Sequence, residues 1–318
     1  RPRDLRLVSH PVVPYVAREI TPDWLEALRS ALPEARIVPF AETTPEERAA
    51  ARVALVANPD PAELAALPAL EWVQSLWAGV ERIVAELPES LKVVRLVDPQ
   101  LAASMAEAVL AWTLYLHRDM PHYAAAQARR DWAPAPMRLA QERPVAILGL
   151  GHLGKAAARA LLAQGFPVMG WTRTPSETEG VAGFHGPEGL ARILSRAEIV
   201  VSLLPLTPQT RGLLGAEALD RLPRGAGLIN FGRGPVVDVA ALTERLADGR
   251  LGHAVLDVFE VEPLPAEDPL WSHPGVTILP HISAPTHKGS ASAIAADNLR
   301  RYLETGEIPP LVDRRRGY

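Results

Sequence analysis

The sequence predicts an α/β protein with two domains, each built from strands that alternate with helices. Its 318 residues are enough to bury two hydrophobic cores. Short apolar runs alternate with helix-like patterns before residue 99 and after residue 144, and an apolar helical stretch interrupts this alternation. We therefore expect residues 1–98 and 286–318 to form one discontinuous domain, and residues 99–285 to form the other.

The first of these domains is expected to be the smaller one and to have a flavodoxin-like fold. Residues 21–32 match a helix with Thr21 at its N-cap and Pro22 at its first position. Shorter helices are predicted at residues 61–67 and 80–87. The predicted strands cover residues 5–9, 35–40, 52–57, 71–76 and 92–97.

We also predict the structure of three segments outside this alternation of strands and helices. Residues 105–118 form a helix pattern that is apolar on nearly all sides, so we expect it to be buried, either between domains or against another subunit. A second helix is expected to begin at Pro121 and to end near Trp132. A long helix after Pro285 should return to the first domain, and residues 314–316 read as a solvated basic tail.

The second domain shows the pattern of a Rossmann-type, doubly wound sheet. Residues 239–249 match a helix with Asp238 as its N-cap. The six predicted strands cover residues 145–149, 167–172, 199–204, 227–231, 253–258 and 276–279. Six parallel strands are the number expected for a dinucleotide-binding fold.

A glycine-rich turn at residues 145–154, VAILGLGHLG, is the most informative stretch. A buried strand precedes Gly149, Gly151 and Gly154, and a helix closed by Gly165 follows them. In this context Gly149 permits the tight turn, Gly151 lets the backbone approach a phosphate, and Gly154 lets the helix pack on the strand. The turn predicts a dinucleotide site at the N-terminus of the helix.

The end of the second strand indicates which dinucleotide is bound. NAD-binding folds have an acidic residue there, which binds the ribose 2′-hydroxyl. This chain has Thr172 and Arg173, and no carboxylate occurs before Glu177. A hydroxyl beside a guanidinium suits a 2′-phosphate, so NADP(H) is preferred and NAD(H) stays possible. The alternative for Arg173 is a solvated turn residue.

Composition excludes several other classes of protein. The net charge of −4 gives no basic surface for nucleic acid, and the absence of cysteine excludes disulfides and thiolate metal sites. No apolar run approaches the ~18 residues that a membrane span needs. The first ten residues lack the apolar core of a signal peptide, so we expect a cytoplasmic protein with no membrane partner. Metalloprotease and P-loop motifs are absent, and no metal is expected.

Three polar residues follow predicted strands of the second domain, where doubly wound folds place their chemistry. Arg233 lies between two glycines, and its guanidinium suits a carboxylate ligand. Glu262 precedes Pro263, and His281 follows Pro280 in a loop that prolines make rigid. An imidazole is the side chain best suited to exchange a proton near neutral pH. Taken singly, Arg233 would be a turn residue and Glu262 a surface residue.

Together, the motifs GLGHLG, LLPLTPQT, INFGRGPVVD, LDVFEVEPLP and TILPHIS have the order and spacing of a known family. The chain resembles the D-isomer-specific 2-hydroxyacid dehydrogenases, and within them most of all the glyoxylate/hydroxypyruvate reductase A group. This resemblance spans essentially the whole chain and includes WAGVERI and the closing VDRRRGY.

The resemblance implies roles for the three polar residues. His281 would donate a proton to the C2 oxygen of a small 2-oxo acid as hydride reaches C2. Glu262 would hold the imidazole ring and favour its charged form, while Arg233 would bind the carboxylate. In the first domain, the amides of Trp77, Ala78 and Gly79 would complete the carboxylate pocket; a core role for the Trp77 side chain is the alternative.

The resemblance also assigns contacts to the cofactor. His152 and Leu153 would join the glycine turn at the pyrophosphate, and Leu204 and Pro205 would line the adenosine side with Thr210 nearby. Phe231 and Asp257 would lie near the nicotinamide ribose and amide. The candidates at the end of the second strand, Thr172, Arg173 and Thr174, rest on their position instead. Asp257 has a second possible role as a support behind the site. His152 replaces an arginine that is common in the family, which leaves the strength of phosphate binding open.

These observations predict an NADPH-preferring reductase of glyoxylate or hydroxypyruvate. The apolar segment at residues 105–118, with the helix after it, suggests a homodimer built on the cofactor domain, as in the family. One alternative is a related dehydrogenase with another substrate. Formate dehydrogenases carry Gln where this chain has Glu262, and phosphoglycerate dehydrogenases differ by a C-terminal regulatory domain. The other alternative is a dinucleotide-sensing scaffold of the same fold with little turnover.

Overall fold

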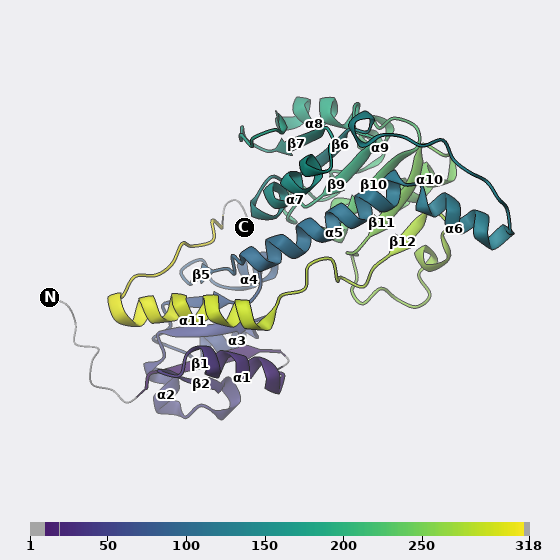
Figure 1. Ribbon diagram of the computed structural model, residues 1–318. Coiled ribbons are helices and arrows are strands. Elements are labelled where there is room, and N and C mark those ends of the chain that lie inside the picture. Colours follow the sequence, from purple (N-terminus) through teal and green to yellow (C-terminus); the bar gives the residue numbers. More distant parts are fainter. Residues whose placement is uncertain (1–9, 19, 315–318) are drawn as a thin grey trace. The chain divides into compact units, whose positions relative to one another are not determined.

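The computed structural model describes residues 10–18 and 20–314 (Figure 1). The chain divides into two compact units. One comprises Arg1–Gln100 and Thr286–Tyr318, and we call it unit 1; the other, unit 2, is Leu101–Pro285. The predicted strand at residues 5–9 lies outside the described residues.

Unit 1 has a parallel sheet of five strands in the order β2-β1-β3-β4-β5. This is the flavodoxin-like order, as predicted. The strands are β1 (Val12–Ala17), β2 (Arg36–Pro39), β3 (Val53–Ala57), β4 (Trp72–Ser75) and β5 (Lys92–Val94). The helices are α1 (Pro22–Ala31), η1 (Phe40–Glu42), α2 (Pro45–Ala50), α3 (Pro61–Ala65), α4 (Glu81–Glu86) and α11 (Lys288–Thr305). Sequence reasoning missed β1, whose run VVPYVA contains a proline that argues against a central strand.

Helix α11 belongs to unit 1 although residues 101–285, which form unit 2, separate it in the sequence from the strands of unit 1. Its buried face packs with α1 and one face of the sheet. Asn298 donates to the Gln74 side chain on β4 at 2.9 Å, and Arg300 donates to the Ala31 carbonyl oxygen at the end of α1. Figure 1 shows α11 lying along the sheet beside α1. The long helix therefore returns to the first strands, as expected.

The end of the described chain corrects one expectation. Arg314 was expected to be solvated, but its guanidinium donates to carbonyl oxygens of Val84, Leu87, Pro88 and Leu91 at 2.7–3.3 Å. These oxygens lie at and just after the C-terminal end of α4, where a helix leaves carbonyl groups without intrahelical partners. An arginine satisfies them and complements the negative end of the helix dipole. Residues 315 and 316 lie outside the described residues.

Unit 2 has a parallel sheet of seven described strands, in the order β12-β11-β10-β9-β6-β7-β8. They are β6 (Val145–Leu148), β7 (Val168–Thr172), β8 (Ala182–His185), β9 (Ile199–Ser202), β10 (Ala226–Asn230), β11 (Leu251–Leu256) and β12 (Val276–Ile278). The prediction of six strands missed β8. This edge strand is mostly exposed and its sequence, AGFH, lacks the β-branched residues that mark a strand.

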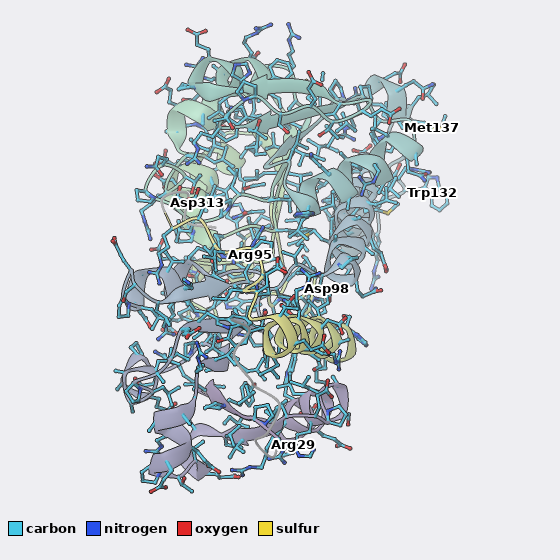
Figure 2. The ribbon with its side chains drawn as sticks, turned by 90° about the vertical axis from the view of Figure 1, so that its left-hand side faces the viewer. Arg29, Arg95, Asp98, Trp132, Met137 and Asp313 are labelled. Atoms are coloured by element: carbon cyan, nitrogen blue, oxygen red, sulfur yellow. The ribbon has the colours of Figure 1, made fainter. Side chains whose placement is uncertain are left out.

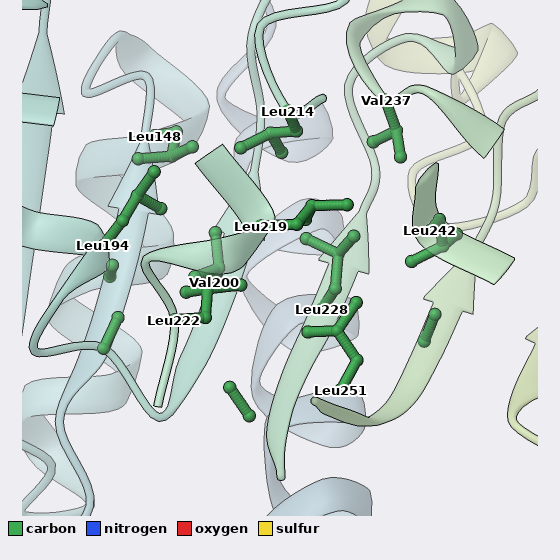
Figure 3. Packing of buried hydrophobic residues seen from close by; sticks show 14 of the residues in the cluster. Leu148, Leu194, Val200, Leu214, Leu219, Leu222, Leu228, Val237, Leu242 and Leu251 are labelled. Carbon is green, nitrogen blue, oxygen red and sulfur yellow. The ribbon is translucent and has the colours of Figure 1, made fainter. Parts of the chain in front are cut away.

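Helices cover both faces of this sheet. They are α5 (Pro99–His117), α6 (Met120–Arg129), η2 (Ala140–Glu142), α7 (His152–Ala163), α8 (Gly186–Leu194), α9 (Ala216–Asp220), η3 (Gly234–Val236), α10 (Val239–Ala247) and η4 (Pro269–Ser272). Figure 3 shows side chains from β6, α8, β9, α9, β10, α10 and β11 meeting in one core. Helices α5 and α7 pack on the other face. No helix in the described part of the chain is long and apolar enough to span a bilayer.

Helix α5 is covered over most of its surface. Its buried residues, such as Met105, Val109 and Leu116, pack against the sheet of unit 2 itself. After its first two residues, only Ala103, Glu107 and Ala111 on the helix are exposed. Further burial of α5 between domains or against another subunit stays a prediction.

Candidate active site

Three neighbouring strands of unit 2 place the candidate catalytic residues at one edge of the sheet. Arg233 follows β10, Glu262 follows β11 and His281 follows β12. These strands are parallel neighbours, so their carboxyl ends meet at the same edge. Ligands of doubly wound folds bind outside this edge. The three residues therefore come from adjacent loops although they span 49 positions of the sequence.

The structure joins Glu262 and His281 directly. Glu262 Oε2 lies 2.7 Å from His281 Nδ1, and its other oxygen accepts the Phe259 amide at 2.8 Å. Both carboxylate oxygens are thus engaged, which fixes the carboxylate relative to the ring. The His281 side chain is 55% exposed. Because Nδ1 bonds to Glu262, Nε2 is the ring nitrogen that can donate a proton to a ligand.

The backbone of His281 adopts an unusual conformation that Asp257 supports. Its φ is +54°, in the left-handed region that residues other than glycine rarely adopt. Asp257, which is 2% exposed, accepts the Ile282 amide at 2.7 Å and the Ser283 amide at 2.9 Å. These bonds hold the two residues after His281 and offset the cost of its conformation. Asp257 therefore acts on the histidine loop, consistent with the supporting role.

The two glycines beside Arg233 lie so close to other loops that no side chain would fit at either position. A Cβ at Gly232 would lie 2.5 Å from the Leu204 carbonyl oxygen, and one at Gly234 would overlap the Phe259 backbone. Asn230, buried at the end of β10, donates to the Arg233 carbonyl oxygen at 3.0 Å. The Arg233 loop therefore packs tightly between the loops that contain Leu204 and Phe259. This packing positions the Arg233 side chain at the same edge of the sheet.

The glycine turn has the geometry that a pyrophosphate needs. Gly149 has a φ of +102°, and a Cβ on Gly154 would overlap the Gly149 carbonyl oxygen. A Cβ on Gly151 would meet no atom within 4 Å, so open space lies beside this backbone at the start of α7. The three predicted glycine roles match these observations, and the residues present fit a dinucleotide phosphate group.

We expect Gly154→Ala to destabilise unit 2 by about 1–3 kcal/mol, because the added methyl group must push α7 away from the Gly149 turn. Gly151→Ala is the matched control: its methyl group has room and its φ of −74° is open to alanine, so the melting temperature should stay unchanged. The same methyl group would fill the phosphate position, so Gly151→Ala should weaken dinucleotide binding. Thermal unfolding and fluorescence titration measure the two effects; equal melting temperatures for both variants would contradict this account.

The other predicted cofactor residues lie around the same edge. His152 opens α7 and is exposed, and Leu153 is partly buried. At the end of β7 the Thr172 hydroxyl donates to the Thr174 carbonyl oxygen at 2.7 Å. Arg173 is exposed, and its guanidinium contacts no other described side chain.

The segment after β9 contains residues that were predicted at the adenosine end. The Thr210 hydroxyl donates to the Pro205 carbonyl oxygen at 2.6 Å and accepts the Thr207 amide at 2.8 Å. The Thr210 hydroxyl therefore stabilises the loop that contains it. Leu204 is buried, and so is Phe231, which directly follows β10.

In unit 1, the predicted carboxylate-binding segment follows β4. The Trp77 amide donates to Ser75 Oγ at 3.0 Å, so this amide is occupied. The described residues provide no hydrogen-bond partner for the amides of Ala78 and Gly79. The Trp77 ring packs edge-on against Trp24, with 5.5 Å between ring centroids. Trp77 is thus partly a core residue, and Ala78 and Gly79 carry the available amides.

Sequence reasoning did not identify Asn230 or Ser75 as residues that shape these loops. Both are buried polar side chains at the end of a strand, and both bond to the backbone of the loop that follows. A buried polar group needs a hydrogen-bond partner. A polar residue at the end of an otherwise apolar strand is therefore the sequence signal that could have identified Asn230 and Ser75.

Comparisons with known proteins agree with this geometry. Residues 110–283 match the family model for the D-isomer specific 2-hydroxyacid dehydrogenase NAD binding domain. A D-isomer specific 2-hydroxyacid dehydrogenase from Xanthobacter autotrophicus Py2, solved with NADPH and MES, is 44% identical with a TM-score of 0.89. That alignment covers 98% of this chain and 100% of the relative.

Two further solved structures are similar over nearly their full length. An NADPH-dependent glyoxylate/hydroxypyruvate reductase from Sinorhizobium meliloti, in complex with NADP and sulfate, is 34% identical with a TM-score of 0.88 over 96% of this chain and 99% of the relative. A probable 2-hydroxyacid dehydrogenase from Rhizobium etli CFN 42, in complex with NADP, HEPES and L(+)-tartaric acid, is 33% identical with a TM-score of 0.88 over 98% and 100%. The chain belongs to the D-isomer specific 2-hydroxyacid dehydrogenase family.

Proposed function

We propose that this protein reduces small 2-oxo acids, such as glyoxylate and hydroxypyruvate, to 2-hydroxy acids with NADPH. The observation that carries the proposal is the hydrogen-bonded pair of His281 and Glu262 on adjacent loops at the carboxyl edge of a dinucleotide fold. The similarity to the S. meliloti glyoxylate/hydroxypyruvate reductase supports this substrate class.

The contact between His281 and Glu262 supports the roles that we propose for them. When bound, NADPH supplies the hydride that reaches C2 of the substrate. His281 donates a proton from Nε2 to the C2 oxygen, so the carbonyl becomes an alcohol. Glu262 holds Nδ1 and stabilises the positive charge on the ring before the transfer. Arg233 binds the substrate carboxylate, which fixes the carbonyl in place for the transfer.

The decisive experiment is a steady-state assay of glyoxylate and hydroxypyruvate with NADPH and with NADH. The proposal requires that the enzyme release one molecule of glycolate or glycerate for each NADPH that it oxidises. Dinucleotide binding without measurable oxidation would instead favour the scaffold, and turnover confined to other 2-oxo acids would favour a related dehydrogenase.

We expect Arg173→Ala to weaken NADPH binding about 10–100-fold while it changes NADH binding little, because charge-assisted hydrogen bonds contribute about 1.5–3 kcal/mol. Arg173 follows Thr172 at the end of β7, and neither residue is acidic. Titration of both reduced dinucleotides measures the effect, and Arg196→Ala, an exposed arginine after α8, is the matched control. Equal weakening of both dinucleotides would show that Arg173 does not bind the 2′-phosphate.

We further propose that the protein is a homodimer formed through α6 and the segment after it. Trp132 is 97% exposed and Met137 is 78% exposed, and Met120, Tyr123 and Leu139 are also exposed nearby in the sequence. Figure 2 shows Trp132 and Met137 at the same outer edge of unit 2. Large exposed apolar side chains that gather in one place are typical of protein interfaces. The molar mass from light scattering tests this proposal.

A further inference from the structure

The edge strand β8 brings His185 beside the end of β7 in unit 2. The two strands pair in parallel, and Thr172 on β7 lies opposite His185 on β8. Neighbouring strands lie about 4.8 Å apart, so the backbone of His185 is adjacent to Thr172 and to Arg173, which follows it. An imidazole and a guanidinium therefore come from neighbouring strand ends at the carboxyl edge of the sheet.

The Thr172 hydroxyl has no proton left for a phosphate at this edge. It donates to the Thr174 carbonyl oxygen at 2.7 Å, and a hydroxyl has only one proton to donate. A phosphate group carries several strong acceptor oxygens. The expected pair of a hydroxyl and the Arg173 guanidinium is therefore short of one donor, and a second side chain is needed to complete it.

The imidazole of His185 is available as this donor. His185 is the N-cap residue of α8, yet its side chain makes no capping hydrogen bond. The side chain is exposed, and it forms no hydrogen bond, ion pair or ring contact with any described residue. Arg192 on α8 is engaged elsewhere, since its guanidinium lies over the Phe184 ring at 5.7 Å from the centroid. The ring nitrogens of His185 are thus unused within unit 2.

The backbone around His185 is held in place on both sides. The Trp171 indole Nε1 donates to the Gly186 carbonyl oxygen at 2.8 Å, which ties the residue after His185 to β7. A Cβ on Gly183 would lie 3.4 Å from the Ser176 carbonyl oxygen, so the loop after β7 passes beside β8. The loop after β7 and the end of β8 are therefore packed together, and the imidazole projects from a fixed position.

We propose that His185 binds the 2′-phosphate of NADPH together with Arg173, and that it is a second determinant of the preference for NADPH over NADH. This inference rests on the proposed function, in which NADPH is the coenzyme. A neutral imidazole can donate one hydrogen bond to a phosphate oxygen, and a protonated one makes this bond charge-assisted. NADH has a hydroxyl in place of the phosphate, so it gains less from the contact.

The test measures the binding of NADP⁺ and NAD⁺ by calorimetry, which needs no turnover. The two dinucleotides differ only in the 2′-phosphate. His185→Ala should weaken NADP⁺ binding about 10-fold and change NAD⁺ binding less than about twofold, because a hydrogen bond to a charged group is lost. His185→Gln keeps a side-chain donor and should recover part of the loss. The melting temperature should stay unchanged, since the imidazole does not cap α8.

The matched control is His273→Asn. His273 lies just before β12, at the opposite edge of the same sheet, so this variant should bind both dinucleotides as the wild-type protein does. An equal loss of NADP⁺ and NAD⁺ binding in His185→Ala would indicate a contact with the adenosine that both share, and it would overturn the assignment. Unchanged NADP⁺ binding would overturn it as well.

The binding data also separate this inference from the proposed function. If the wild-type protein reduced no 2-oxo acid but bound NADP⁺ through His185, the reductase activity would fail and the inference would stand. If it reduced glyoxylate with NADPH while His185→Ala bound NADP⁺ normally, the activity would stand and the inference would fail. Equal affinity of the wild-type protein for NADP⁺ and NAD⁺ would also refute the inference, whatever the activity.

Discussion

Replacing His281 with alanine is expected to lower kcat for glyoxylate by about 10²–10⁴-fold, the range that a positioned acid or base contributes. The substitution removes the imidazole whose Nδ1 bonds to Glu262 and whose Nε2 would donate the proton. NADPH binding should change little, because the glycine turn follows β6, four strands away from β12, the strand that His281 follows. Stopped-flow measurement of NADPH oxidation and a fluorescence titration report the two quantities.

The control for this variant is His273→Asn. His273 is another histidine of unit 2, and its Nδ1 accepts a hydrogen bond from the Gly275 amide at 3.1 Å. The side-chain oxygen of an asparagine can accept the same hydrogen bond. This control should keep full activity. If His281→Ala turned over glyoxylate at a near-normal rate while it stayed folded, another group would have to be the proton donor.

Replacing Arg233 with alanine should lower kcat/KM for every 2-oxo acid by about 10²–10³-fold, because the proposed guanidinium contact both binds the carboxylate and stabilises charge that develops on the carbonyl oxygen. Arg233→Lys should recover only part of this activity, since an ammonium group lacks the planar fork. The backbone of the loop should survive, because Gly232, Gly234 and the Asn230 bond to the Arg233 carbonyl oxygen remain.

Three measurements make this prediction specific. Melting temperatures check the fold, and Arg221→Ala controls for the loss of a surface arginine, since Arg221 pairs with Glu217 at the surface. Added guanidinium ion should restore part of the activity of Arg233→Ala and none of that of His281→Ala. The Arg233 effect should be the same for glyoxylate and hydroxypyruvate, because both substrates have the carboxylate that Arg233 is proposed to bind. An unchanged KM and kcat in Arg233→Ala would remove Arg233 from the site.

The sequence predicted the parts of the fold that local patterns determine. The buried strand at Val145–Leu148, the glycine turn after it and the Asp238 cap of α10 all follow from spacing and residue type, and the structure contains them. The edge strand β8 was missed because an exposed strand needs few apolar residues. The packing of α5 against the sheet of unit 2 could not be predicted, because an apolar surface does not indicate which element will cover it.

The candidate site was likewise predictable from the sequence only in part. Residue types and strand ends indicated Arg233, Glu262 and His281, and the structure adds the bond between the last two. The bonds from Asp257 to the backbone after His281 could not be read from the sequence, because they join residues 25 and 26 positions apart through a left-handed turn.

The order of strands in unit 2 has a consequence for how such a protein can change. The glycine turn and Arg173 follow β6 and β7, whereas Arg233, Glu262 and His281 follow β10, β11 and β12 on the other side of β9. In the proposed function, loops on opposite sides of β9 would therefore carry dinucleotide recognition and acid chemistry. Mutations that exchange one coenzyme for another could then accumulate without disturbing the proton donor, so coenzyme choice and reaction type would be independently evolvable traits.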